Sequence, residues 1–168
     1  MKKLSLCIIT ALSLVSLGIL TACGVSAAPK EAGSTQLPNP FIPCASIEDA
    51  NEILGFIAAV PSILPDGYET AAIAAVSSSA PAFVQIRYEN GEKTVTYRMG
   101  KGSGNISGDY NSYEFTKTLE AGENTLTCNG AGELIYNAVW EADGYTYSLT
   151  ATDGITENEL QELVESIA

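Results

Sequence analysis

Residues 83–98 read FVQIRYENGEKTVTYR, two runs of alternating apolar and polar residues joined by an Asn-Gly pair. Alternation with a period of two predicts strands, and Asn-Gly between such runs is the strongest short signal for a β-hairpin. A two-residue turn pairs its flanking residues, Glu89 and Glu92. Ile86 then lies opposite Val95, and all the apolar side chains fall on one face of the hairpin.

The same pattern recurs in residues 133–150, where Asp143-Gly144 separates two alternating runs. Pairing across this turn sets Trp140 opposite Tyr147, with the apolar residues again on one face. Shorter runs over residues 69–77, 113–119 and 125–128 predict further strands. The sequence therefore predicts an antiparallel sheet with one buried and one polar face.

Two capping boxes, which begin at Ser46 and Thr156, predict a helix near each end of the domain. The apolar residues of the first helix recur at helical spacing, before Pro61 ends it: Ile47, Ala50, Leu54 and Ile57. Those of the second do the same: Leu160, Leu163, Val164 and Ile167. We expect an α+β fold, in which an antiparallel sheet made as a meander of hairpins is packed by an N-terminal and a C-terminal amphipathic helix.

The start of the chain predicts export and lipidation. A positively charged beginning and a mostly apolar run over residues 4–20 are typical of a signal peptide. The following Leu20-Thr21-Ala22-Cys23 resembles the lipobox of bacterial lipoproteins. This resemblance implies that diacylglycerol, with acyl chains such as palmitate, is attached to the thiol of Cys23 and that residues 1–22 are removed. The alternatives are an ordinary secretory signal and a retained transmembrane helix.

These signals predict the organisation of the whole chain. Residues 23–40 contain the lipidated Cys23 and a tether rich in Ala, Gly, Ser, Thr and Pro, and residues 41–168 form one α+β domain. We expect the protein on the outer, extracytoplasmic face of the cell membrane. Its contact with the membrane is expected to be through the lipid on Cys23.

Composition excludes several classes of function. Without residues 1–22 the chain keeps 6 basic and 20 acidic residues, a net charge of −14. A protein that binds nucleic acid needs a basic face, so we expect no nucleic-acid partner. Histidine is absent, which excludes a Ser-His-Asp or Cys-His nucleophile and a zinc site built on imidazole. We therefore expect neither enzymatic activity nor a cofactor nor a metal.

Two cysteines, Cys44 and Cys128, remain after Cys23 in a chain that is predicted to be exported. Outside the cytosol, such a pair is a candidate disulfide. The alternative is two unpaired buried thiols.

Two stretches could carry chemistry, but each has a plainer interpretation. Residues 100–111 are rich in Gly, Asn and Ser, yet no helix follows to bind a phosphate and the spacing differs from that of a calcium loop. An exposed loop is the favoured interpretation. Glu141 and Asp143 could act as an acid and a base, but a pair beside a hairpin turn arises by chance in so acidic a domain.

Aromatic residues on alternate strand positions give the remaining candidate site. Tyr97, Tyr136, Trp140 and Tyr147 could line an apolar groove for a ligand. Such residues form the core of a sheet more often than a groove.

Several short motifs together resemble a domain of unknown function that is found in lipoproteins of Gram-positive bacteria and on the outer side of some membrane-bound anti-sigma factors. The motifs span residues 39–167: Asn39-Pro40-Phe41, Leu64-Pro65-Asp66-Gly67-Tyr68, Tyr88-Glu89-Asn90-Gly91, Ile106-Ser107-Gly108-Asp109-Tyr110-Asn111, Ala138-Val139-Trp140, Tyr145-Thr146-Tyr147-Ser148 and Ser166-Ile167. The resemblance implies an extracytoplasmic α+β domain with no established activity. We expect this chain to differ from those anti-sigma factors by lacking a cytoplasmic region for binding a sigma factor and a retained transmembrane helix.

We therefore expect a cell-surface lipoprotein whose domain binds or senses an unknown protein or a small apolar ligand without catalysis. The alternative is a carrier of lipid or lipopeptide, in which the sheet and a helix enclose an apolar groove. This second arrangement resembles the lipoprotein-carrier folds.

Overall fold

A computed structural model describes residues 39–168. The predicted signal peptide, the lipidation site Cys23 and nearly all of the predicted tether lie outside the described residues. Residues 39–168 belong to one compact unit. None of its described helices is long and apolar enough to cross a membrane.

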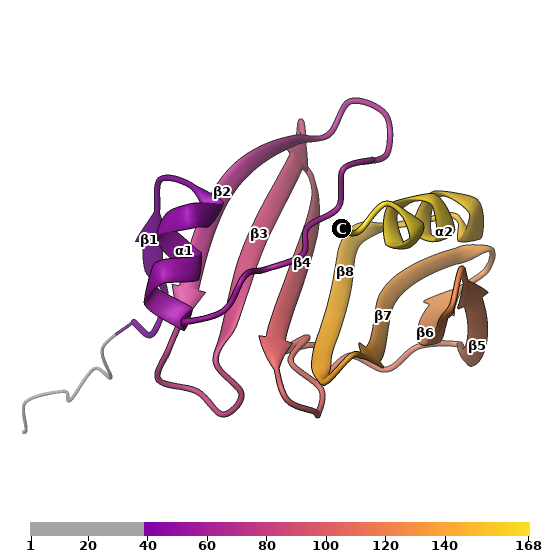
Figure 1. The fold of residues 1–168 in the computed structure, drawn as a ribbon. Coiled ribbons are helices and arrows are strands. Elements are labelled where there is room, and N and C mark those ends of the chain that lie inside the picture. The colour runs from indigo at the N-terminus through magenta and orange to yellow at the C-terminus, as the bar shows by residue number, and fades with distance from the viewer. Residues whose placement is uncertain (1–38) are drawn as a thin grey trace, which may run out of the picture. The chain divides into compact units, whose positions relative to one another are not determined.

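The unit is an eight-stranded antiparallel sheet with two short helices (Figure 1). The predicted α+β class with an antiparallel sheet is confirmed. The strands are ordered β1-β2-β3-β4-β8-β7-β6-β5 across the sheet. Their bounds are β1 Ile42–Cys44, β2 Glu69–Val76, β3 Phe83–Asn90, β4 Lys93–Lys101, β5 Phe115–Ala121, β6 Asn124–Ala131, β7 Leu134–Ala142 and β8 Tyr145–Ile155, and the helices are α1 Ile47–Leu54 and α2 Glu157–Glu165.

The hairpin of β7 and β8 has the predicted register, with Trp140 opposite Tyr147. Its turn is formed by Asp143 and Gly144, with φ angles of 51° and 79°. Positive φ at both central positions is what a type I′ turn requires, and Asp-Gly supplies it at low cost.

The register predicted for β3 and β4 is wrong by two residues. Asn90 pairs with Lys93, and Ile86 lies opposite Tyr97 instead of Val95. Gly91, at φ 60°, takes the first central position of the turn, as it does in type II′ turns. A shift of two residues preserves the alternation, so the predicted buried face is unchanged.

Both helices begin at the predicted capping boxes, with Ser46 before α1 and Thr156 before α2. The predicted length of α1 is wrong, because Gly55 adopts the left-handed conformation and ends the helix. Ile57, which was expected on the apolar face of this helix, lies beyond its end and is 83% exposed.

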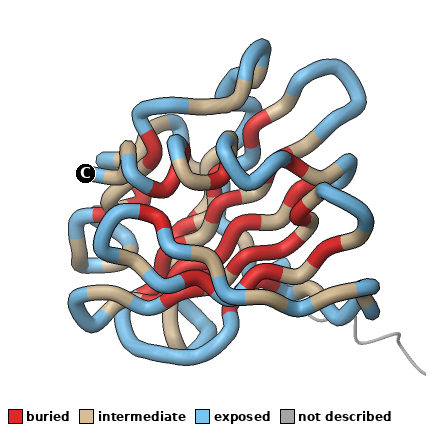
Figure 2. The backbone as a smooth tube through the Cα atoms, turned by 90° about the vertical axis from the view of Figure 1, so that its right-hand side faces the viewer, coloured by how far each residue is buried: buried red, intermediate tan, exposed pale blue. Residues whose placement is uncertain are grey.

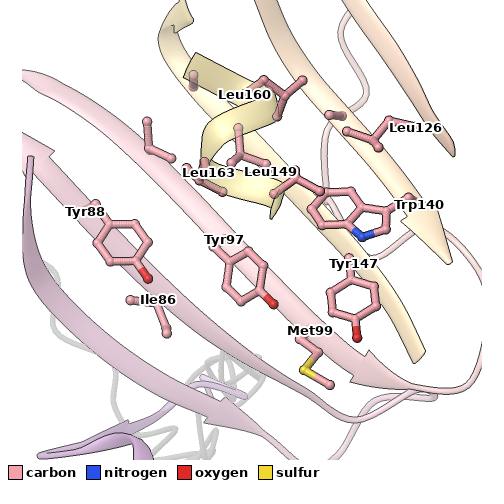
Figure 3. Packing of buried hydrophobic residues seen from close by; sticks show 14 of the residues in the cluster. Ile86, Tyr88, Tyr97, Met99, Leu126, Trp140, Tyr147, Leu149, Leu160 and Leu163 are labelled. Atoms are coloured by element: carbon pink, nitrogen blue, oxygen red, sulfur yellow. The ribbon is translucent and has the colours of Figure 1, made fainter. Parts of the chain in front are cut away.

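The apolar face of the sheet holds the hydrophobic core, and Figure 2 shows buried residues concentrated along the strands. The two helices contact different parts of the sheet: α1 contacts β1, β2 and β3, and α2 contacts β5. In Figure 3, Leu160 and Leu163 of α2 lie near Leu149 of β8. All three side chains are fully or almost fully buried.

An extended segment, residues 56–68, covers the middle of the sheet. The hydroxyl of Tyr97 in β4 donates to the carbonyl oxygen of Ala59 at 2.7 Å, and the amide of Ala59 contacts the sulfur of Met99 at 3.2 Å. Pro61 pairs with Ile167 after α2. The core therefore depends on this irregular segment as well as on the helices.

Buried tyrosines make the fold sensitive to alkali. Burial raises the pKa of Tyr88 to about 12, whereas a tyrosine in an unfolded chain ionises near pH 10. Between about pH 10 and 12 the unfolded chain loses this proton and the folded chain keeps it, so stability falls as the pH rises. This single group accounts for at most about 3 kcal/mol.

We expect Tyr88→Phe to remove part of this loss, while changing stability little at pH 7. The measurement is the free energy of unfolding in urea between pH 8 and 12. Other groups with a raised pKa, such as Cys128, make the free energy of unfolding fall with pH in both proteins. The difference between the two curves therefore isolates the contribution of Tyr88. Parallel curves would contradict the assignment.

Candidate functional site

The four aromatic residues predicted to line an apolar groove do not form one. Tyr97, Trp140 and Tyr147 are between 0 and 7% exposed and belong to the core (Figure 3). The rings of Trp140 and Tyr147 are stacked, with centroids 5.2 Å apart and planes 4° apart. These three residues are part of a packed core, which is the plainer of the two interpretations of their spacing.

Tyr136 lies on the other face of the sheet because β7 contains a bulge there. Ile135 and Asn137 have partners in both neighbouring strands, whereas Tyr136 has none in either. A bulge redirects the extra residue of a strand. The ring of Tyr136 packs against Tyr113, with centroids 6.0 Å apart and planes 27° apart.

Tyr113 and Tyr136 line a cavity of about 770 Å³ on the polar face, which we call the polar cavity. Its size is typical of sites for small molecules, but those sites are mostly apolar. The other lining residues are polar or small, apart from Phe41: Gln85, Thr94, Thr96, Arg98, Ser107, Gly108, Asp109, Asn111, Ser112, Thr150, Ala151 and Thr152.

The floor of the polar cavity follows from the strand register. Thr96 in β4 pairs with Thr150 in β8, and Thr150 pairs with Asn137 in β7. Gln85 in β3 pairs with Arg98 in β4. These positions alternate with core residues on each strand, so the sheet holds their side chains at fixed spacing on a rigid surface.

One wall of the cavity is the glycine-rich connection between β4 and β5, residues 102–114. The interpretation of this stretch as a plain exposed loop is wrong in part, because Ile106 and Ser107 are only 7% and 5% exposed. Thr146 donates to the carbonyl oxygen of Gly104 at 2.5 Å, and Glu141 accepts a hydrogen bond from the amide of Gly104 at 2.8 Å. The sheet therefore holds the loop through several polar contacts.

Arg98 joins this loop to the floor of the cavity. Its Nη1 donates to the carbonyl oxygens of Ile106 and Ser107 at 2.7 and 2.6 Å, and its Nε donates to Gln85 at 2.9 Å. The rings of Phe41 and Phe83 lie 5.9 and 5.2 Å from the guanidinium carbon, within the range of a cation–π contact.

The charge of Arg98 has no carboxylate partner among residues 39–168, where the ion pairs are Arg87 with Glu89 and Lys117 with Glu157. Its partners are neutral oxygens and aromatic rings. Burial lowers the pKa of the Arg98 guanidinium from its ordinary value. It is the one cation in the lining of the polar cavity.

Asp109, the one carboxylate in this lining, is occupied by donors of its own loop. It accepts hydrogen bonds from the hydroxyl of Tyr113 at 2.5 Å and from the side-chain and backbone nitrogens of Asn111 at 2.8 and 3.0 Å. Burial and this bond to Asp109 raise the pKa of Tyr113. Asp109 thus fixes the shape of the loop.

Asn137 has the only buried side-chain polar atom without a hydrogen-bond partner in the described part of the chain, its Nδ2. The side chain is 2% exposed, and its Oδ1 accepts from Asn129 at 3.1 Å. A buried donor without a partner destabilises a fold by about 1–3 kcal/mol. Asn137 lies in the same cross-strand row as Thr96 and Thr150 of the cavity floor.

The predicted disulfide does not form, because Cys44 and Cys128 are free thiols. Cys44 ends β1 at one edge of the sheet, whereas Cys128 is in β6 near the other edge, with five strands between them. A disulfide requires Cα atoms less than about 7 Å apart. Burial raises the pKa of the Cys128 thiol to about 11, so it is unreactive at neutral pH.

Within residues 39–168, no group of three or more acidic or cysteine side chains could hold a metal ion. The sequence-based prediction assigned Tyr136 to an apolar groove, whereas it lines the polar cavity, and it missed Arg98 and Tyr113. Asp109 had two signals in the sequence: it lies in the stretch of residues 100–111 that was weighed as a calcium loop, and in a motif that carried the family resemblance.

The profile of one protein family matches residues 58–167, and its description is Domain of unknown function (DUF4367). The match covers β2 to β8 and all of α2, and so includes most of the polar cavity. No curated protein matches the chain.

Proposed function

Since the chain belongs to this family of unknown function, we propose its function from the geometry of the polar cavity. The domain is a non-catalytic binding or sensing module that takes a small polar ligand into this cavity. The single observation that supports the proposal is a hollow of about 770 Å³ on a rigid sheet, whose lining includes one cation and several residues with hydroxyl or amide side chains.

The proposed location of this module is the cell surface. We propose that the lipid on Cys23 holds the domain on the extracytoplasmic face of the membrane, as in lipoproteins of Gram-positive bacteria. The absence of histidine from the sequence supports binding over catalysis. The ligand is then a molecule that reaches the domain from outside the cell or from the cell wall.

The carrier of lipid or lipopeptide remains the alternative function. It requires an apolar groove, but Tyr97, Trp140 and Tyr147 pack against one another in the core. No described feature favours it over the polar ligand, and the experiment below separates the two.

The test is mass spectrometry of small molecules that co-purify with the protein from its own cells. We expect a polar compound in stoichiometric amount, and we expect Thr96→Trp to abolish its retention by filling the floor of the cavity. Thr118→Trp on the exposed edge strand β5 is the matched control, because it adds the same bulk away from the cavity.

A lipid retained equally by both variants and by Cys23→Ala would favour the carrier. A compound whose retention is the same in Thr96→Trp and Thr118→Trp would contradict binding in the polar cavity.

A further inference from the structure

We infer that the ligand of the polar cavity carries a carboxylate and that Arg98 binds it through Nη2. The inference rests on the proposed function and names the chemical class of the ligand. Its evidence is one donor group of a lining residue, the Nη2 of Arg98, for which the described residues provide no acceptor.

Arg98 has a donor group that is free for a ligand. Its Nε and Nη1 are used by Gln85 and by the carbonyl oxygens of Ile106 and Ser107, whereas Nη2 makes no hydrogen bond to any residue in 39–168. The bonds at Nε and Nη1 and the two flanking phenyl rings fix the plane of the guanidinium. A guanidinium with a fixed plane binds planar oxyanions with little further loss of entropy.

The hydrogen bonds of Arg98 to the loop do not explain why this residue carries a positive charge. A neutral donor would bind the carbonyl oxygens of Ile106 and Ser107 without the cost of desolvating a cation. The buried positive charge is useful if an anion enters the cavity, because a charge-assisted hydrogen bond is about twice as strong as a neutral one. Because the chain has a net charge of −12, its overall charge does not attract anions. An attraction for an anion at this cavity therefore comes from the local charge of Arg98.

One positive charge selects a monoanion. A carboxylate carries a single charge that one guanidinium balances, whereas a phosphate monoester carries nearly two at neutral pH. The surplus charge of a phosphate would meet Asp109 in the same lining and the acidic surface around it. The carboxylate is therefore the better match.

The rest of the cavity indicates an uncharged, hydroxyl-bearing body for the ligand. Threonine side chains at positions 94, 96, 150 and 152 line the floor, and the stacked rings of Tyr113 and Tyr136 form a side. An acidic sugar, with one carboxylate and several hydroxyls, has this combination of groups.

The test compares glucuronate with glucuronamide by calorimetry on the full chain. The two differ in one group, a charged carboxylate with two acceptor oxygens in the first and a neutral carboxamide in the second. We expect glucuronate to bind at least about tenfold more tightly, since a hydrogen bond to a charged group has this effect on affinity. We expect Arg98→Gln to abolish that preference. Arg98→Lys keeps the charge but loses the planar fork, so most of the preference should be lost in a variant that retains a cation beneath the loop.

Arg87→Gln is the matched control, because it makes the same change of charge on the adjacent strand β3. Arg87 is exposed, is paired with Glu89 and does not line the cavity. We expect it to leave the preference for glucuronate unchanged.

The ratio of the two affinities separates ligand binding from a purely structural role. If Arg98 only held the loop, Arg98→Gln would weaken both probes equally and the ratio would not change. That result would overturn the inference, as would equal binding of the two probes to the native protein or the failure of both to bind. Inorganic phosphate that displaces glucuronate completely at equal concentration would show a general anion site and would also overturn it. In each case the co-purification experiment still tests the proposed function independently.

Discussion

Replacing Trp140 with alanine should lower the free energy of unfolding by about 3–5 kcal/mol. The indole is 5% exposed and stacks on Tyr147. Figure 3 shows it beside Leu126 and Leu149, which are fully buried. Since these neighbours belong to the strands of a rigid sheet, they would close the resulting space only in part, and the loss should approach the upper end of this range.

Tyr136→Ala is the control, because it removes an aromatic ring from the opposite face of the same strand. Tyr136 is partly exposed and packs on one ring, Tyr113, so we expect a loss of about 1 kcal/mol. Urea unfolding of both variants measures the difference. If Trp140→Ala destabilised no more than Tyr136→Ala, Trp140 would line an open groove, and the carrier function would become the stronger proposal.

Local turn chemistry explains which parts of the fold could be predicted from the sequence. The register of β7 and β8 depends on Asp143-Gly144, where both residues adopt positive φ and no other contact interferes. The register of β3 and β4 could not be predicted in the same way, because the side chain of Asn90 donates to the carbonyl oxygen of Asp66 at 3.0 Å. This contact comes from a distant loop, and no local rule contains it.

The candidate site was missed for a similar reason. Alternation along β7 assigns Tyr136 to the same face as Trp140, but the bulge reverses it, and the bulge depends on how β6 and β8 pair with β7. The disulfide prediction failed because the order of the strands, which the sequence does not specify, separates Cys44 from Cys128. Arg98 reads as an ordinary polar position on a strand until the loop over it is known.

Replacing Gly130 with alanine should destabilise the domain by at least about 3 kcal/mol, at the upper end of the effects of overpacking. A Cβ atom on Gly130 would lie 2.1 Å from the carbonyl oxygen of Leu134 and 2.4 Å from the Cζ atom of Phe115. The ring could move, but the carbonyl belongs to the backbone of the adjacent strand. The chain would have to separate β6 from β7 at this position.

Gly130 pairs with Ile135, immediately before the bulge that places Tyr136 beside the polar cavity. The substitution should therefore disturb the candidate site as well as the stability. Gly132→Ala is the control, because Gly132 adopts φ 59° with no atom in contact, and its cost of about 1–2 kcal/mol comes from the left-handed conformation alone.

Two measurements separate these effects. Urea unfolding should show the larger loss for Gly130→Ala, and nuclear magnetic resonance should show a change in the ring-proton shifts of Tyr113 and Tyr136 in this variant alone, because the bulge holds their stack. Equal losses of stability in the two variants would mean that the strands accommodate the extra methyl group. Unchanged ring shifts in Gly130→Ala would mean that the placement of Tyr136 depends on β8 and on the loop of Tyr113 and is independent of the pairing with β6.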